Sequence, residues 1–199
     1  SLTGTLPTEL GELSALTLLY LSENSFTGTM PTELGRLTNL LQLGLDGNNL
    51  NGTLPTELGQ LTMLSSIYLG NNSFTGSIPT EIGQLVELTE LFINLNQLHG
   101  RLPIELGQLG LLWLSLANNS FTGTVPTELG DLSALTTLDF SDNTFTGTLP
   151  TEMGQLTNLT DFSISKNNLN GTVPTELGQL STLLHLSLQE NMFTGTLPT

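Results

Sequence analysis

Three side chains near the C-terminus, Asp161, His185 and Ser187, are of the types that hydrolyse substrates through an activated hydroxyl. If Asp161 and His185 lie on adjacent strands, Ser187 lies two residues farther along the same face. An open sheet face, however, provides no water-excluding pocket, no strained turn for the nucleophile and no donor pair for an oxyanion. We therefore predict that the chain is not an enzyme and has no catalytic residues.

Metal and cofactor chemistry have equally little support in the residue types. The chain has no cysteine and two histidines, His99 and His185, that are far apart in sequence. It also lacks the spacing of acidic residues that an EF-hand requires. We expect neither a metal site nor a cofactor.

These residues belong to a strongly periodic sequence, and the period determines where they lie. One supersecondary unit that repeats cannot close a globular core, so each unit buries its apolar side against the next. The sequence predicts a single solenoid array over residues 1–199, with about eight repeats of 24 residues. Both ends fall inside a repeat without a polar terminal unit, so we expect the terminal caps to be missing and the chain to be part of a longer array. The marker glycines recur every 24 residues with one interval of 23: Gly4, Gly28, Gly52, Gly76, Gly100, Gly123, Gly147, Gly171 and Gly195.

Each repeat contains a short strand followed by an asparagine. Apolar residues alternate with variable ones around Leu138 and Phe140, which predicts a strand with one buried face, and stacked strands form a parallel sheet. The asparagine amide both donates and accepts, so an inward ladder of these residues can satisfy backbone groups where the chain leaves the strand. The predicted ladder is Asn24, Asn48, Asn72, Asn96, Asn119, Asn143, Asn167 and Asn191.

A short helical turn is predicted after each glycine. All nine prolines share one column, from Pro7 to Pro198, where a fixed φ suits the start of a helix. The threonine before most of the repeating glutamates is expected to cap this turn, and the glutamate faces the positive end of its dipole.

The pattern LxxLxLxxN followed by LxGxxPxxLGxL resembles the plant-type leucine-rich repeat of 24 residues, over essentially the whole chain. The segment around Leu109, Gly110 and Leu111 departs from it by lacking one residue, and the PTELG turn is most similar to repeat proteins of algae or protists. The resemblance implies an α/β solenoid: a right-handed curved array with a parallel concave sheet and short 3-10 turns on the convex side. It also implies non-catalytic recognition on the concave face, as in receptor-kinase ectodomains and polygalacturonase-inhibiting proteins, and an extracellular or cell-surface location.

Charge and hydropathy limit the partners. Lys and Arg total 3 against 18 Asp and Glu, and the net charge of -15 repels phosphate backbones and anionic lipids. No apolar run approaches the ~20 residues needed to span a bilayer. We expect no nucleic acid and no membrane contact by this segment. A protein or peptide ligand is favoured, and carbohydrate is possible.

The outward positions of the predicted strands carry the candidate binding residues. Neighbouring strands lie ~4.8 Å apart, so Tyr68, Phe92 and Trp113 form one aromatic patch, edged by Glu90. Such residue types are enriched at interfaces. The alternative is that the rings only stabilise packing between strands.

An acidic stretch lies farther along the same face. It comprises Asp139, Asp142 and Asp161 and ends near Lys166 and His185. A cationic or sugar partner would suit it, whereas the alternative is a solvated acidic face. The complete set of predicted ligand-binding residues is Tyr20, Tyr68, Glu90, Phe92, Trp113, Asp139, Asp161 and His185.

The repeated TGT segment suggests a second class of function. If it is a strand, its two threonines project the same way ~7 Å apart and recur in every coil, similar to the arrays of ice-binding solenoids. Asn51, Asn170 and the pair His99 and Arg101 interrupt the array. Ice or crystal-surface binding is one alternative function and a structural or adhesive spacer is another, while threonine also simply favours exposed strands.

Overall fold

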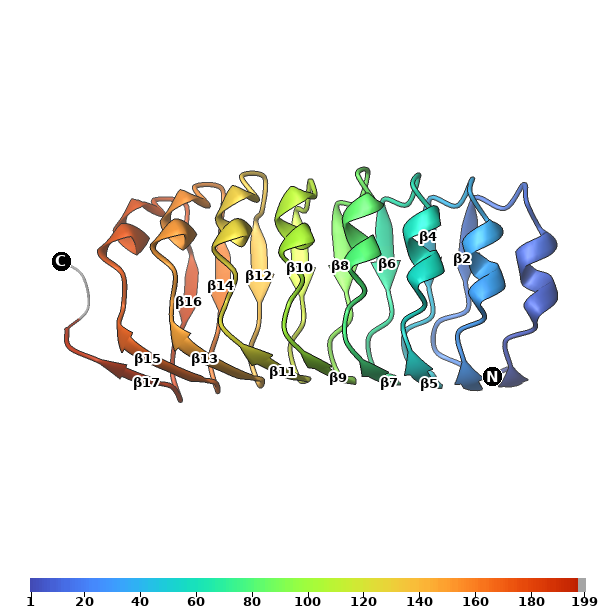
Figure 1. Ribbon diagram of the computed structural model, residues 1–199, viewed down its shortest axis with the longest axis horizontal. Coiled ribbons are helices and arrows are strands. Elements are labelled where there is room, and N and C mark those ends of the chain that lie inside the picture. The colour runs from blue at the N-terminus through green and yellow to red at the C-terminus, as the bar shows by residue number, and fades with distance from the viewer. Residues whose placement is uncertain (197–199) are drawn as a thin grey trace.

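The computed structural model describes residues 1–196 as an elongated stack of coils (Figure 1). Each coil runs from a short strand through a corner into a second strand, then through a 3-10 helix back to the first strand of the next coil. Within the described residues, elements pack against their counterparts in adjacent coils. The predicted α/β solenoid with a parallel sheet on one side and 3-10 turns on the other is confirmed.

The first strands of the coils form one parallel sheet, which is the predicted concave sheet and has eight strands in the described residues. Its strands pair in register along the stack, as Leu43 does with Ile67. The central residue of each strand points inward, and most of these are fully buried. The strands are β2 (Leu18–Tyr20), β4 (Gln42–Gly44), β6 (Ser66–Tyr68), β8 (Glu90–Phe92), β10 (Trp113–Ser115), β12 (Thr137–Asp139), β14 (Asp161–Ser163) and β16 (His185–Ser187).

The segment around each TGT is a strand as well, and these strands form a second parallel sheet, of nine strands in residues 1–196. Most of its inward apolar residues are buried, and Phe74 and Phe121 are fully buried. The strands are β1 (Thr3–Thr5), β3 (Ser25–Thr29), β5 (Asn49–Thr53), β7 (Ser73–Gly76), β9 (Gln97–Gly100), β11 (Ser120–Gly123), β13 (Thr144–Thr148), β15 (Asn168–Thr172) and β17 (Met192–Thr194).

The side of the stack opposite the eight-stranded sheet carries one 3-10 helix per coil (Figure 1). Successive helices approach so closely that a glycine is required between them: a Cβ on Gly59 would lie 2.6 Å from the carbonyl oxygen of Glu81. The helices are η1 (Thr8–Glu12), η2 (Thr32–Arg36), η3 (Thr56–Gln60), η4 (Thr80–Gln84), η5 (Ile104–Gln108), η6 (Thr127–Asp131), η7 (Thr151–Gln155) and η8 (Thr175–Gln179).

The expected threonine cap of these helices is wrong. The proline occupies the N-cap position in each of η1 to η8, and no side chain caps the backbone. The threonine is already the first helical residue, and its hydroxyl donates to the neighbouring carboxylate, as Thr56 Oγ1 does to Glu57 Oε2 at 3.3 Å. A capping oxygen must come from the N-cap residue, and here that residue is proline, whose side chain has no acceptor.

The asparagine ladder is confirmed in all eight coils. Asn143 donates through Nδ2 to the carbonyls of Phe140 at 3.2 Å and of Leu116 in the preceding coil at 3.0 Å. Its Oδ1 accepts from the backbone N–H of Phe121, also in the preceding coil, at 3.0 Å. Each asparagine therefore joins two coils, and within the described residues no buried side-chain nitrogen or oxygen lacks a partner.

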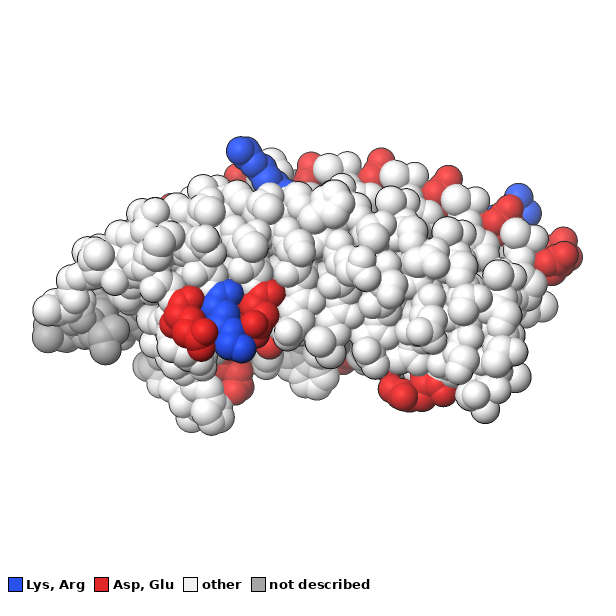
Figure 2. Space-filling model, turned by 90° about the horizontal axis from the view of Figure 1, so that it is seen from below, with Lys and Arg blue, Asp and Glu red and all other residues white. Residues whose placement is uncertain are grey.

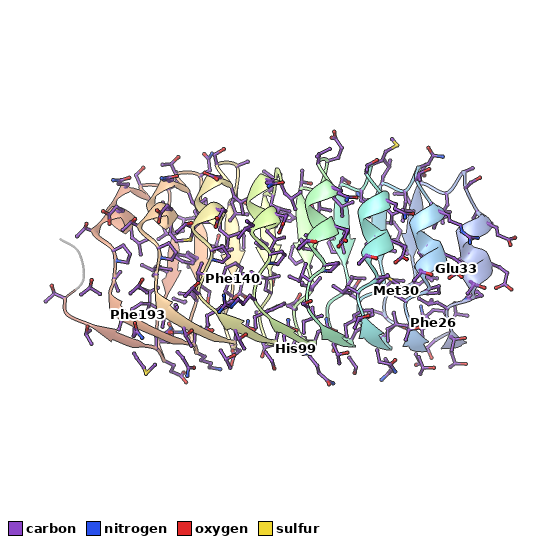
Figure 3. The ribbon with its side chains drawn as sticks, viewed as in Figure 1. Phe26, Met30, Glu33, His99, Phe140 and Phe193 are labelled. Carbon is purple, nitrogen blue, oxygen red and sulfur yellow. The ribbon has the colours of Figure 1, made fainter. Side chains whose placement is uncertain are left out.

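A continuous apolar core fills the space between the two sheets and the helices. Phe26, Met30 and Phe140 lie inside the stack, whereas Glu33 lies on a helix and His99 lies at the nine-stranded sheet (Figure 3). The shortened repeat does not interrupt this core, because Leu109 and Leu111 both remain buried. Leu109, the C-cap residue of η5, is extended with ψ 159°. The equivalent C-cap residue of η4, Leu85, has ψ 64°. The backbone therefore straightens at Leu109 to span the missing residue.

Candidate functional site

The outward positions of the eight-stranded sheet form two rows, one from the first residue of each strand and one from the third. The strand register places Glu90 beside Trp113 in the first row and Tyr68 beside Phe92 in the second. Trp113 therefore lies diagonally across from Phe92, because the direct neighbour of Phe92 on β10 is Ser115.

The aromatic patch of Tyr68, Phe92 and Trp113 is contiguous, as the sequence predicts. The rings of Tyr68 and Phe92 are stacked, with centroids 5.5 Å apart and planes inclined by 21°. Phe92 meets Trp113 edge to face at 6.2 Å. Tyr68 and Phe92 are half-buried, whereas Trp113 retains 42% of its surface exposed. The three rings thus support one another while leaving apolar surface open to a partner.

Tyr20 extends the second row by an arrangement that the sequence analysis missed. The third residue of β4 is Gly44, and a Cβ at this position would lie 3.0 Å from Cδ1 of Tyr20. The ring of Tyr20 therefore leans over Gly44 in the direction of Tyr68. The signal in the sequence was a glycine at an outward strand position between two tyrosines.

Both tyrosine hydroxyls are held by the next strand. Tyr20 donates to Oε1 of Gln42, and Tyr68 donates to Oε2 of Glu90. Burial and the hydrogen bond with Glu90 raise the pKa of Tyr68 above its ordinary value. Glu90 thus lies at the edge of the patch, as predicted, and its carboxylate accepts a hydrogen bond from the hydroxyl of Tyr68.

The acidic residues of this face are held locally. Asp139 accepts from the backbone N–H and the hydroxyl of Ser141, at 3.0 and 2.6 Å. Asp142 lies beyond the strand with φ 53° and forms an ion pair with Lys166 at 3.3 Å. The predicted neighbourhood of Lys166 is therefore correct for Asp142.

Asp161 and His185 are direct neighbours on β14 and β16. Oδ1 of Asp161 lies 2.6 Å from Nδ1 of His185, and the hydroxyl of Thr160 donates to Oδ2 at 2.7 Å. The Thr160 hydrogen bond and then His185 lower the pKa of Asp161. No hydrogen bond within residues 1–196 joins His185 to Ser187, and the imidazole is largely exposed, so the geometry of a hydrolytic triad is not assembled.

The nine-stranded sheet presents a face of different chemistry. None of its strand residues is Asp, Glu, Lys or Arg. Seen toward this side, most of the surface is uncharged, with one cluster of both signs, separate acidic patches and further charged side chains along the edge (Figure 2). Threonine methyls lie along the sheet, since Cγ2 of Thr148 is 2.9 Å from the Cβ position of Gly171 in the next coil. Its strands are staggered by two residues from coil to coil, so the threonines pair between different columns of the repeat: Thr5 lies beside Thr27, Thr53 beside Thr75, Thr122 beside Thr144 and Thr172 beside Thr194.

Residues 1–196 contain no group of three or more His, Cys, Asp or Glu arranged to hold a metal ion. Over the same residues, no helix has both the length and the apolarity to cross a bilayer.

A family model described as Leucine Rich Repeat matches residues 15–37, 39–61, 63–85, 110–132, 134–156 and 158–180. No curated protein matches the sequence. Solved structures do: a plant peptide hormone receptor in complex with RGF2 is 34% identical with a TM-score of 0.81, over 96% of this chain and 35% of that one. The leucine-rich repeat ectodomain of the Arabidopsis receptor kinase HAESA, in complex with a peptide hormone, is 33% identical with a TM-score of 0.94, over 98% of this chain and 33% of that one.

A leucine-rich repeat protein of Leptospira interrogans is 41% identical with a TM-score of 0.82, over 96% of this chain and 47% of that one. The chain therefore spans about a third to a half of the length of these proteins. A plant ice-binding protein has the same fold, with 24% identity and a TM-score of 0.71 over 100% of this chain and 72% of that one.

Proposed function

The chain belongs to the leucine-rich repeat family, and on that premise we propose that it is a non-catalytic scaffold that binds a protein or peptide ligand on its eight-stranded sheet, as part of a secreted or cell-surface protein. The observation that carries the proposal is the aromatic patch of Tyr68, Phe92 and Trp113 on the outward side of that sheet. The similar plant receptors, which are structures of complexes with peptide hormones, support a peptide as the ligand.

The chemistry of the patch favours an extended partner over a small metabolite. The rings follow the stack across adjacent strands and remain partly exposed, so a peptide laid across the strands would bury apolar area on several of them. Aromatic side chains contribute most to interface energy when a partner desolvates them. If the rings served only to pack neighbouring strands together, they could be covered by other side chains, but Trp113 remains 42% exposed.

A selection from a random peptide library tests this proposal. Peptides selected on the native chain should lose at least about tenfold in affinity for the double variant Phe92→Ala, Trp113→Ala. The matched control is Met63→Ala with Val86→Ala, which removes two exposed apolar side chains outside the eight-stranded sheet and should leave affinity unchanged. Equal binding to the native chain and to the patch variant would contradict the proposal.

A second candidate function rests on the nine-stranded sheet. Its nine parallel strands contain no charged residue, in a chain with 18 carboxylates, so they are suited to a flat uncharged surface such as ice. Neighbouring pairs of threonines, such as Thr5 with Thr27 and Thr53 with Thr75, present hydroxyl and methyl groups to such a surface, whereas a carboxylate holds its own hydration shell.

Thermal hysteresis measures this candidate directly. Activity that persists in Trp113→Ala and is lost in Thr146→Glu would assign ice binding to the nine-stranded face. The absence of hysteresis at high protein concentration would remove ice binding.

A further inference from the structure

A cavity of about 260 Å³ opens beside the aromatic patch, at the edge where β4, β6 and β8 end. The cavity lies outside the acidic stretch. Its two aromatic walls, Tyr68 and Phe92, belong to the aromatic patch. The residues that line it are Asp46, Tyr68, Gly70, Asn71, Phe92 and Asn94.

The cavity exists because Gly70 has no side chain. Gly70 is buried, and a Cβ at this position would lie 2.9 Å from Oδ1 of Asn94. The amide oxygen of Asn94 therefore lies over Gly70. Asp46 occupies the equivalent position one coil earlier, so a carboxylate and an amide oxygen stand on either side of the gap.

The polar side chains that line the gap are the carboxylate of Asp46 and the amides of Asn71 and Asn94, which can donate as well as accept. Oδ1 of Asp46 accepts from the hydroxyl of Ser22 at 2.5 Å, and Oδ2 makes no hydrogen bond within residues 1–196. The carboxylate of Glu90 is bound by the Tyr68 hydroxyl and does not line the gap. Guanidinium and ammonium groups carry donors and a positive charge, so they match the free carboxylate oxygen of Asp46.

The aromatic walls add attraction of the same sign. A cation over the face of tyrosine or phenylalanine is drawn to the negative face of the ring. Tyr68 and Phe92 are nearly parallel and half-buried at this position, so the ring faces have lost part of their water. Loss of water strengthens both the cation–aromatic contact and the pairing with a carboxylate.

The charge of the surrounding surface favours the same class of ligand. The two outward rows of the eight-stranded sheet contain Glu90, Asp139 and Asp161 but no Lys or Arg. With a net charge of -15, the whole molecule attracts cationic partners over a distance.

We propose that the cavity between Asp46 and Asn94 binds an arginine or lysine side chain of the ligand, against the rings of Tyr68 and Phe92. The identity of the partner as a peptide rests on the proposed function, whereas affinity of the cavity for a cation does not. The peptide ligand is accordingly basic, with a cationic residue next to the apolar segment that covers Phe92 and Trp113.

The test titrates N-acetyl-arginine N-methylamide into the native chain at low salt and follows the ring resonances of Tyr68 and Phe92 by NMR. N-acetyl-citrulline N-methylamide has the same shape without the charge and should bind at least about fivefold more weakly. Asp46→Asn keeps the acceptor for Ser22 and should lower arginine affinity to the citrulline level. Asp139→Asn removes the same charge from a serine-bonded carboxylate outside the cavity, and should change affinity by less than about twofold.

Three results would overturn the proposal. Arginine and citrulline derivatives could bind equally, Asp46→Asn and Asp139→Asn could have equal effects, or methyl glucoside could saturate the same resonances more tightly and thereby assign the cavity to a saccharide. Failure of the proposed function gives a different result: selected peptides that bind independently of Phe92 and Trp113, while the arginine titration is still positive. If both hold, replacing the cationic residue of a selected peptide by citrulline lowers affinity for the native chain but not for Asp46→Asn.

Discussion

Asn143 shows how a single residue joins two coils. Its side chain makes three hydrogen bonds through Nδ2 and accepts one through Oδ1, and two of these four bonds reach the preceding coil. In Asn143→Ala the partners, which include the N–H of Phe121, stay buried without replacement. We expect the free energy of unfolding to fall by about 1–3 kcal/mol.

Urea unfolding followed by circular dichroism measures this loss. The matched control is Asn49→Ala, because Asn49 is exposed on the nine-stranded sheet. A control that loses as much stability as Asn143→Ala would show that the ladder bonds are not the cause.

The pKa of Asp161 provides a second test at the residue scale. The hydrogen bond from Thr160 is the largest single cause of the lowered pKa, and His185 adds a hydrogen bond and its charge, so Thr160→Val and His185→Gln should each raise the pKa of Asp161. A lowered pKa in the folded chain means that any stability from ionised Asp161 is present above the ordinary pKa of aspartate and is lost as pH falls through the lowered value. NMR titration of the side-chain carboxyl carbon in both variants measures the pKa, and an unchanged pKa in either variant would contradict the assigned cause.

The sequence predicts which residues share the outward rows but not how their side chains lean. Alternation along the strand and a strand spacing of ~4.8 Å are sufficient to bring Tyr68, Phe92 and Trp113 together. The lean of Tyr20 over Gly44, and the gap that Gly70 leaves between Asp46 and Asn94, depend on neighbouring side chains in three dimensions. Periodicity carries no information on such contacts, so the cavity could not be predicted.

The elements follow from the repeat because each is specified by several residue columns at once. The inner strand, the asparagine and the helical turn were all predicted, and the second strand was predicted as a condition for the threonine array. The threonine cap was wrong because a proline takes the N-cap position and the threonine is already inside the 3-10 turn of five residues.

The glycine of each helix gives a prediction in which the same substitution has opposite effects. A Cβ on Gly59 would lie 2.6 Å from the carbonyl oxygen of Glu81, so Gly59→Ala should destabilise the chain by about 2 kcal/mol or more. Gly178 occupies the same position of η8 and has nothing within 4 Å of its Cβ position. Gly178→Ala in the 199-residue chain should leave stability unchanged or raise it by up to about 1 kcal/mol.

Urea midpoints for the two variants check this prediction. Equal destabilisation would mean that helix–helix spacing does not determine the need for glycine. A neutral Gly59→Ala would mean that the coils move apart at little cost.

The whole molecule separates its chemistry by face. Carboxylates recur along the 3-10 helices, aromatic and acidic residues share the eight-stranded sheet, and the strands of the nine-stranded sheet contain no charged residue. The sequence predicts this separation only in part, because the uncharged face depends on a second sheet that the sequence analysis treats as a condition. Each face can therefore be altered without changing the others, which is why the variants proposed for the two sheets can serve as controls for each other.

The glutamate column on the helices makes the stability of the whole array depend on salt. Like charges recur in consecutive coils, and two unit charges about 10 Å apart in water repel by about 0.4 kcal/mol. The Debye length shortens from about 30 Å at 0.01 M salt to about 3 Å at 1 M, so added NaCl removes most of this repulsion. We expect the melting temperature to rise by about 2–5 °C over this range.

A variant set identifies the source of that dependence. Glu57→Gln, Glu81→Gln and Glu105→Gln together should raise the melting temperature at low salt and flatten its rise with NaCl. The control with Glu12→Gln, Glu87→Gln and Asp131→Asn removes the same charge from exposed positions outside the column and should flatten the rise less. A flat salt response in the native chain would show that the positive ends of the helix dipoles already offset the column. Equal flattening in both variants would instead assign the effect to net charge, because only repulsion within the column depends on which carboxylates are removed.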